Sequence, residues 1–141
     1  MVTMPFYDEM EYYQSIKRRF HEMAFTNWFE NLNQQQVSEK LNEADVLVLP
    51  SIRNEAAPLV ILEAFAKKIP VIGSDYIAIK EMVQHNINGL IFKNGDAQSL
   101  KEQLRRLINE PDLLQKLSDN IKPVRTFKEV ATAHDKVYKG L

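Results

Sequence analysis

The apolar residues of this chain follow two spacings, one typical of helices and one typical of buried strands. Between Tyr7 and about Glu22 they recur at helical intervals on one face, at Met10, Tyr13, Ile16 and Phe20. Two short runs, Ala44–Pro50 and Pro70–Asp75, are almost wholly apolar, as are strands buried on both faces of a parallel sheet. The pattern therefore predicts a fold in which helices alternate with buried strands.

Further helices and strands complete the predicted order. Strands are expected at 24–29 and 88–92, and helices at 34–43, 58–68, 77–85, 97–109, just after Pro111-Asp112 and at 126–139. This order predicts an α/β fold, a Rossmann-like, mainly parallel sheet flanked by helices, with residues 1–141 as a single domain. Ligands of such sheets bind beyond the carboxyl ends of the strands.

Some residues are expected to start or end these elements. Pro58 suits the first turn of a helix, where a missing N–H costs nothing. Asp96 is expected to cap the helix at 97–109, and Gly89 to take a left-handed turn after Asn88. The side chains of the capped helix that are expected to face inward are Leu100, Leu104, Leu107 and Ile108.

Composition and charge narrow the classes of function. With 141 residues, 45% of them hydrophobic and 26% charged, the chain suits an ordinary globular domain with a real core. Its net charge of −1 gives no general reason to bind nucleic acid or an anionic membrane. The lack of cysteine excludes disulfides, thiolate catalysis and cysteine-based zinc sites.

The sequence also predicts where the protein works. Its start, "MVTMPFYDEM", lacks the basic-then-apolar pattern of a signal peptide. No apolar run approaches the roughly 20 residues needed to cross a bilayer. A cytoplasmic location is therefore expected, and peripheral attachment to the inner face of a membrane stays open.

Two glutamates flank the predicted start of the helix at 58–68. The order strand, loop, helix places this start at the carboxyl edge of the sheet, on the ligand side. A helix start offers free N–H groups and the positive end of the helix dipole, which together favour anions. Glu55 lies just before it and Glu63 just over one turn inside it. Their carboxylates can accept hydrogen bonds from hydroxyls on either side of a bound diphosphate, as in a nucleotide diphosphate sugar.

A known family shares the residues around this pair. The chain resembles the carboxyl-terminal, donor-binding half of group 1 (family 4) glycosyltransferases, which have the GT-B fold, in "ADVLVLPSIRNEAAPLVILEAFAKKIPVIGSD", "NGLIF" and "NGDAQSLKEQLRRLINEP". Seven residues separate Glu55 from Glu63, and Ala64 follows the second glutamate. The resemblance runs from about Ala44 to Ser118 and continues more weakly on both sides.

That resemblance implies a role for each site residue. Glu55 would lie near the hydroxyls of the transferred sugar, as the catalytic residue, and Glu63 would bind the ribose hydroxyls of the nucleotide. The backbone amides of Leu59 and Val60 would contact the diphosphate. The other donor-binding candidates are Ser51, Ala57 and Pro58. No cofactor or metal is implied, in agreement with the lack of an Asp-x-Asp motif.

The resemblance further implies a reaction. A hexose-type sugar would pass with retention from a UDP- or GDP-linked donor to a glycan, lipid or other acceptor, as in polysaccharide biosynthesis. The bond to the diphosphate breaks through an oxocarbenium-like state while negative charge grows on the phosphate. One well-placed N–H donor at a helix start would stabilise that charge by about 3 kcal/mol.

The sequence departs from the family pattern at two loops. The usual glycine-rich or aromatic loop between the glutamates is "AAP" here, at 56–58. After Asp75, where the family often has two adjacent glycines and a proline, the chain has Ile77, Ala78 and Lys80, although Glu81 still matches.

The resemblance also implies parts upstream of this chain. In the family, the phosphate-binding arginine and lysine, the first strands of the donor domain and the acceptor-binding domain all precede the matched region. The chain is therefore expected to be a fragment that is inactive alone, with the helix at 126–139 reaching toward a missing acceptor domain.

Other interpretations stay open. Glu63 could form an ordinary ion pair with Lys67, four residues later on the same helix. Ser51 could serve only a turn. The alternative function is a non-catalytic α/β module for binding or oligomerisation, since an unpaired edge strand favours a homodimer. A flavodoxin-like regulatory domain would need an acidic cluster that Asp45 and Asp75 do not supply convincingly.

Overall fold

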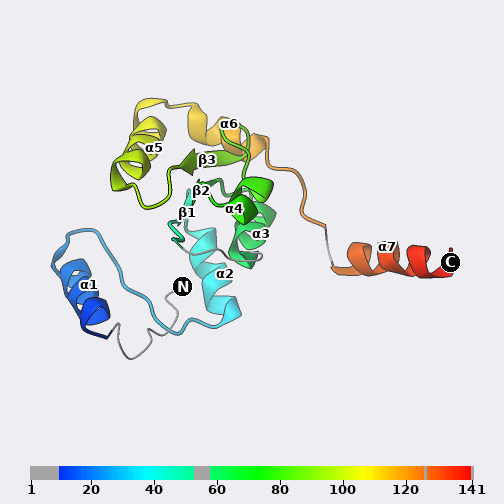
Figure 1. Cartoon of the computed structure of the whole chain (residues 1–141), viewed down its shortest axis with the longest axis horizontal. Coiled ribbons are helices and arrows are strands. Elements are labelled where there is room, and N and C mark those ends of the chain that lie inside the picture. Colours follow the sequence, from blue (N-terminus) through cyan, green and yellow to red (C-terminus); the bar gives the residue numbers. More distant parts are fainter. Residues whose placement is uncertain (1–9, 53–57, 126, 141) are drawn as a thin grey trace. The chain divides into compact units, whose positions relative to one another are not determined.

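A computed structural model of the protein describes residues 10–52, 58–125 and 127–140, except for the side chain of Phe127. The chain divides into two compact units, residues 1–40 and residues 41–141, which are described separately (Figure 1).

The first unit is built on helix α1, Met10–Glu22, and the segment that follows it. The Tyr13 ring packs edge-on against the Trp28 indole, with ring centroids 5.9 Å apart. The Tyr13 hydroxyl and the Trp28 indole N–H both donate hydrogen bonds to the Glu30 carboxylate. This carboxylate also forms an ion pair with Lys17 Nζ at 2.8 Å. These donors, the lysine first, lower the pKa of Glu30 to about 2.

The prediction of a strand at 24–29 is wrong, because these residues form a turn and an irregular segment. Phe25 has a left-handed backbone, with φ of 63°. The Thr26 hydroxyl donates to two carbonyls in or next to the last turn of α1, those of Phe20 at 2.7 Å and Met23 at 2.9 Å. The segment therefore closes the end of α1, and its Trp28 packs on Phe20 of that helix instead of entering a sheet.

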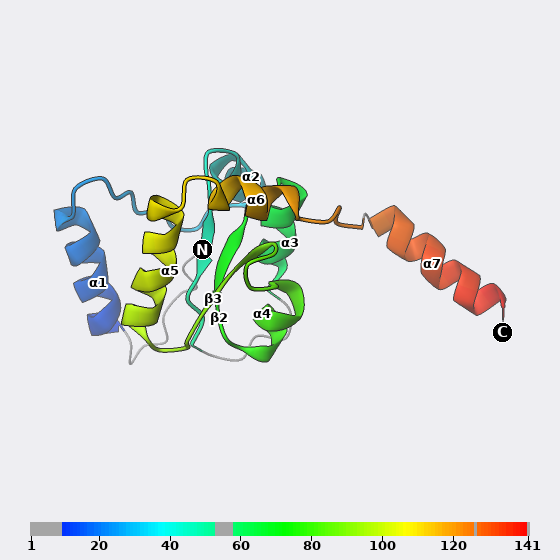
Figure 2. The same ribbon diagram turned by 90° about the horizontal axis from the view of Figure 1, so that it is seen from above.

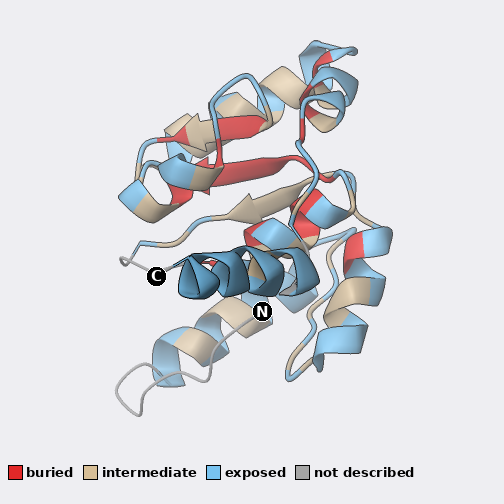
Figure 3. Ribbon diagram, turned by 90° about the vertical axis from the view of Figure 1, so that its right-hand side faces the viewer, coloured by how far each residue is buried: buried red, intermediate tan, exposed pale blue. Residues whose placement is uncertain are grey.

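The second unit contains a parallel sheet with the strand order β1-β2-β3, formed by Leu47–Leu49, Val71–Ser74 and Gly89–Phe92. The predicted α/β fold class with parallel strands is confirmed. All four residues of β2 are buried, as predicted, whereas the three of β1 are only partly buried (Figure 3). Full burial of β1 was therefore a wrong prediction, because within the described residues β1 pairs with a strand on one side only.

Helices cover both faces of this sheet. Helices α3 (Leu59–Ala66) and α4 (Ile77–Met82) lie on one face and α5 (Ala97–Asn109) on the other (Figure 2). The remaining helices are α2 (Gln34–Asn42), α6 (Leu113–Asp119) and α7 (Phe127–Lys139). The predicted helices are thereby confirmed, with ends that differ by a few residues.

The core between α5, α6 and the sheet is one apolar cluster. Its buried members are Ile72, Leu90, Phe92, Leu113 and Leu117. Leu100, Leu104 and Leu107 of α5 pack against it, as predicted. Ile108 does not, since it is 78% exposed. It lies about 100° further round the helix than Leu107, outside the stripe that faces the sheet.

Asp96 caps α5 as predicted. Its Oδ1 accepts hydrogen bonds from the backbone N–H groups of Gln98 and Ser99, each at 3.0 Å. These bonds satisfy two donors that the first turn of a helix leaves without intrahelical partners.

The turn before β3 uses asparagine, not glycine, as its left-handed residue. Asn86 has φ of 63°, and its Oδ1 accepts from Arg106 Nη1 of α5 at 2.9 Å. Gly89 begins β3 instead, and a Cβ added there would lie 2.2 Å from the Val71 carbonyl oxygen. The prediction of a left-handed Gly89 was therefore wrong, because this glycine allows close approach of β3 to β2.

His85 connects the same turn to the strand. Its Nδ1 accepts the backbone N–H of Ile91 at 2.9 Å. Burial, followed by the positive charge of Arg106, lowers the pKa of this imidazole. The neutral form is the one that can accept this hydrogen bond.

The junction between α3 and β2 is closed by Lys68 in a left-handed conformation, with φ of 62°. The N–H of Lys68 donates to Phe65 and that of Ile69 to Ala64, both at 3.0 Å, which is the Schellman pattern. The Lys68 side chain donates to the carbonyl of Ile121, and its own carbonyl accepts from the Ser118 hydroxyl at 2.7 Å. A non-glycine residue thus ends the helix and also fastens it to the α6 region.

Helix α7 has apolar side chains that the described part of the chain leaves largely exposed. Val137 and Tyr138 are 64% and 74% exposed. Among residues 128–139, only Val130 is partly buried. None of the described helices combines the length and apolar character required to span a membrane.

Candidate functional site

The carboxyl ends of the three strands meet at one edge of the sheet, called here the carboxyl edge. Strand β1 leads into Ser51 and Ile52, β2 into Asp75 and Tyr76, and β3 into the segment 93–96. Parallel αβ sheets bind their ligands at this edge, which makes it the candidate site.

The start of α3 belongs to this edge. Pro58 is buried and stands at the N-cap position with an extended backbone, φ −73° and ψ 93°. Its side chain provides no hydrogen-bond acceptor, so no cap bond satisfies the first turn from that residue. The N–H groups of Leu59 and Val60 open this turn, at the positive end of the helix dipole. Leu59 is 67% exposed, so the first residue of the turn is open to solvent.

Glu63 lies on α3 away from the face that enters the core. The residues of α3 that are buried are Ile61, Ala64 and Phe65, whereas Glu63 is only partly buried. The ion pair with Lys67 is not formed among the described residues, because Lys67 Nζ donates to Asn42 Oδ1 instead. This removes the helix ion pair as an explanation of Glu63 and leaves its carboxylate for another partner. Its proposed contact with ribose stays a prediction.

The other predicted residues are only partly placed. Glu55 and Ala57 lie outside the described residues, so their roles stay predictions. Ser51 follows β1 directly, and its backbone carbonyl accepts a hydrogen bond from Ser74 Oγ at 2.8 Å. The structure thus brings Ser51, Pro58, Leu59 and Val60 to the carboxyl edge, and Glu63 lies one turn along α3.

Sequence reasoning missed the end of β2. Ser74 and Tyr76 both donate hydrogen bonds to the segment after β1, the first to the Ser51 carbonyl and the second to the Ile52 carbonyl. Asp75 Oδ1 accepts the backbone N–H of Asn94 at 2.9 Å, in the segment after β3. The available signal was the tripeptide Ser-Asp-Tyr directly after a fully apolar run, since polar side chains at the carboxyl end of a buried strand reach the neighbouring loops.

No metal cluster appears in the part of the chain that the structure describes, where His, Asp and Glu side chains do not gather in groups of three or more. The reaction without a metal stays a prediction.

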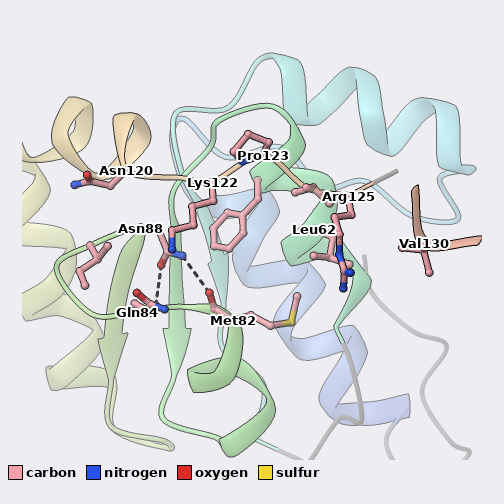
Figure 4. A pocket seen from close by; sticks show the side chains of 12 residues that line it. Leu62, Met82, Gln84, Asn88, Asn120, Lys122, Pro123, Arg125 and Val130 are labelled. Carbon is pink, nitrogen blue, oxygen red and sulfur yellow. Dashed lines mark hydrogen bonds between the residues drawn. The ribbon is translucent and has the colours of Figure 1, made fainter. Parts of the chain in front are cut away.

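One hollow among the described residues of the second unit lies away from the carboxyl edge. It encloses about 420 Å³ and is lined by residues that include Leu62, Phe65, Met82 and Lys122 (Figure 4). Asn88, which also lines it, accepts from Gln84 N at 2.7 Å and donates to the Met82 carbonyl at 3.1 Å. Because Asn88 directly precedes β3, this hollow lies at the amino end of that strand, away from the predicted donor site.

Comparisons with known proteins agree on a family. The family model described as glycosyl transferases group 1 matches residues 10–124. The amylovoran biosynthesis glycosyltransferase AmsK of Erwinia amylovora is 37% identical over 79 residues, which are 52% of this chain and 19% of that protein. The chain therefore spans about a fifth of the length of this curated relative.

Solved structures agree on the fold. A sucrose-phosphate synthase from Thermosynechococcus elongatus matches with a TM-score of 0.77 and 20% identity, over 94% of this chain and 34% of that one. HepE of Anabaena, in complex with UDP and glucose, matches with a TM-score of 0.72 and 18% identity, over 82% of this chain and 32% of that one. The sheet and its helices match GT-B glycosyltransferase structures. The chain belongs to the group 1 glycosyl transferases.

Proposed function

We propose that the carboxyl edge binds the nucleotide diphosphate of a sugar donor and that the chain is the donor-binding part of a retaining, metal-independent glycosyltransferase. A hexose-type sugar would be transferred from a UDP- or GDP-linked donor to a glycan, lipid or other acceptor, in polysaccharide biosynthesis. The observation that carries the proposal is the start of α3 at the carboxyl end of β1, in a chain of this family. A solved relative of the same fold in complex with UDP and glucose supports it.

Each part of the donor is assigned to a chemically suited group. The N–H groups of Leu59 and Val60 and the dipole of α3 suit the diphosphate, whose negative charge grows as the sugar leaves. Glu63, without an ion-pair partner among the described residues, suits the ribose hydroxyls as a hydrogen-bond acceptor. Glu55 is proposed for the sugar hydroxyls and Ser51 for the donor edge.

Titration calorimetry with UDP and with GDP on the 141-residue chain tests this proposal. The Glu63→Gln variant should weaken binding of the preferred nucleotide about tenfold to a hundredfold, because hydrogen bonds to a charged group contribute about 1.5–3 kcal/mol. Glu102→Gln, an exposed glutamate in the middle of α5, is the matched control and should bind as the parent does. Equal affinity of the parent and Glu63→Gln would show the ribose assignment to be wrong.

A second function is favoured by one observation on β1. Within the described residues this strand pairs only with β2 and is partly exposed, so its other edge can accept a strand. A non-catalytic module that forms a homodimer through this edge would sediment as a dimer at micromolar concentration. A monomer that binds UDP or GDP would exclude this alternative.

A further inference from the structure

The residues at the end of β2 hold both neighbouring segments of the carboxyl edge. Ser74 is completely buried, and its hydroxyl donates a hydrogen bond to the Ser51 carbonyl at 2.8 Å. The hydroxyl of Tyr76, two residues later, donates a hydrogen bond to the Ile52 carbonyl. Two successive carbonyls after β1 are therefore held by two hydroxyls from one strand end.

The residue between them holds the other neighbour. Asp75 Oδ1 accepts the N–H of Asn94 at 2.9 Å, and the adjoining segment ends in the Asp96 cap of α5. The three residues 74–76 thus connect the exits of β1 and β3 through β2. We call residues 74–76 the strand-end clasp.

The clasp acts on the chain that enters the candidate donor site. From Ser51 and Ile52 the chain leads, through residues outside the described range, to the buried Pro58 and the first turn of α3. Hydroxyl bonds to the carbonyls of residues 51 and 52 fix where this connection begins, and the burial of Pro58 fixes where it ends. Residues 51 and 52 that are held before the donor arrives need less ordering when it binds.

We propose that Ser74 and Tyr76 are positioning residues of the donor site, which hold the exit of β1 so that the first turn of α3 can receive the diphosphate. Neither side chain needs to touch the donor. This inference rests on the proposed function for its purpose, but the clasp itself can be tested without a ligand.

Hydrogen exchange of the unliganded 141-residue chain, followed by NMR, tests the clasp. Tyr76→Phe removes one hydroxyl and keeps the ring, so the amide of Ile61, which donates to the Pro58 carbonyl in the first turn of α3, should exchange about threefold to tenfold faster, as expected for the loss of one hydrogen bond. The amides of β3, residues 89–92, should keep their rates. Tyr138→Phe removes the hydroxyl of a tyrosine that is 74% exposed and should change nothing. An unchanged exchange rate of the Ile61 amide in Tyr76→Phe would overturn the inference.

Calorimetry with UDP then separates positioning from general stability. If the parent binds UDP, Tyr76→Phe should weaken binding about threefold to tenfold. Its melting temperature should equal that of the Tyr138→Phe control. Ser74→Ala should weaken UDP in the same way, and Ser74→Thr, which keeps a hydroxyl, should recover part of the loss. Equal UDP affinity of Tyr76→Phe and parent would overturn the positioning role. A parent that does not bind UDP or GDP would contradict the proposed function, and the exchange rates would still decide whether the clasp exists.

Discussion

Helices α5 and α7 are a matched pair that differ in what covers them. Each has 13 residues and an apolar stripe along one side. The stripe of α5 packs on the cluster of Ile72, Leu90 and Phe92, whereas most of α7 is exposed in the described part of the chain. The difference shows that an apolar stripe predicts a helix and a covered face, but does not identify the partner that covers it.

The largest effect should come from damage to the strand beneath α5. Gly89→Ala would place a Cβ 2.2 Å from the Val71 carbonyl oxygen and 2.6 Å from Val83 Cγ1, so β3 would have to move away from β2. We expect the free energy of unfolding, measured by urea denaturation, to fall by about 3 kcal/mol or more.

Gly95→Ala is the control for this change. Gly95 has φ of 70° and open space around its Cβ position, so only backbone strain of about 1 kcal/mol is expected. A cost for Gly89→Ala that did not exceed this control would mean that close approach of β3 to β2 does not restrict that position.

Truncation of apolar side chains should separate the two helices directly. Leu104→Ala in α5 removes a side chain that packs on the core cluster and should lower the free energy of unfolding by about 2 kcal/mol. Val137→Ala in α7 removes one that is 64% exposed and should change it by less than about 0.5 kcal/mol. Urea denaturation of both variants measures the difference, and similar losses would indicate that α7 is covered in solution.

The cap of α5 should have a smaller effect. Asp96→Ala leaves the N–H groups of Gln98 and Ser99 without their acceptor and should cost about 1 kcal/mol. Asp96→Asn keeps a capping oxygen and should recover most of the loss. In α7, Asp135→Ala removes only an exposed pair with Lys139 and should cost less than about 0.5 kcal/mol. Thermal unfolding at constant pH compares the three variants.

The smallest effect should be a dependence of stability on pH that His85, next to Arg106 of α5, causes. The pKa of His85 is lowered from its ordinary value of 6.5 by burial and by Arg106, so the unfolded chain takes up the proton first. Its contribution to stability is therefore present above pH 6.5 and is lost as the pH falls toward the lower pKa of the folded state. The melting temperature should fall with acidification through this range, and less so in His85→Gln.

The fold could be predicted from the sequence wherever local patterns and packing agree. The apolar run at Val71–Ser74 became a buried strand, and Asp96 capped α5 as its position indicated. Patterns failed where contacts outside the local segment decide the structure. Trp28 of the segment 24–29 packs on Phe20 of α1, and Gly89 is required by the carbonyl of Val71, eighteen residues earlier.

The candidate site shows the same division. The start of α3 could be located from the strand, the loop and Pro58, because topology alone places it at the carboxyl edge. The hydrogen bond from Lys67 to Asn42 could not be predicted, because a lysine side chain can reach many partners and Glu63 is only one of them. The tripeptide Ser-Asp-Tyr indicated that Ser74 and Tyr76 reach the neighbouring loops, but their acceptors could not be predicted, because backbone carbonyls carry no sequence signal.

The left-handed Lys68 at the end of α3 has a consequence for protein engineering. A design method that scores backbone angles alone would replace it with glycine, the residue that adopts φ of 62° most easily. That replacement would also delete the side chain that reaches the Ile121 carbonyl, 53 residues away in sequence. The position therefore combines a backbone requirement with a long-range anchor, and a substitution optimised for one of them weakens the other.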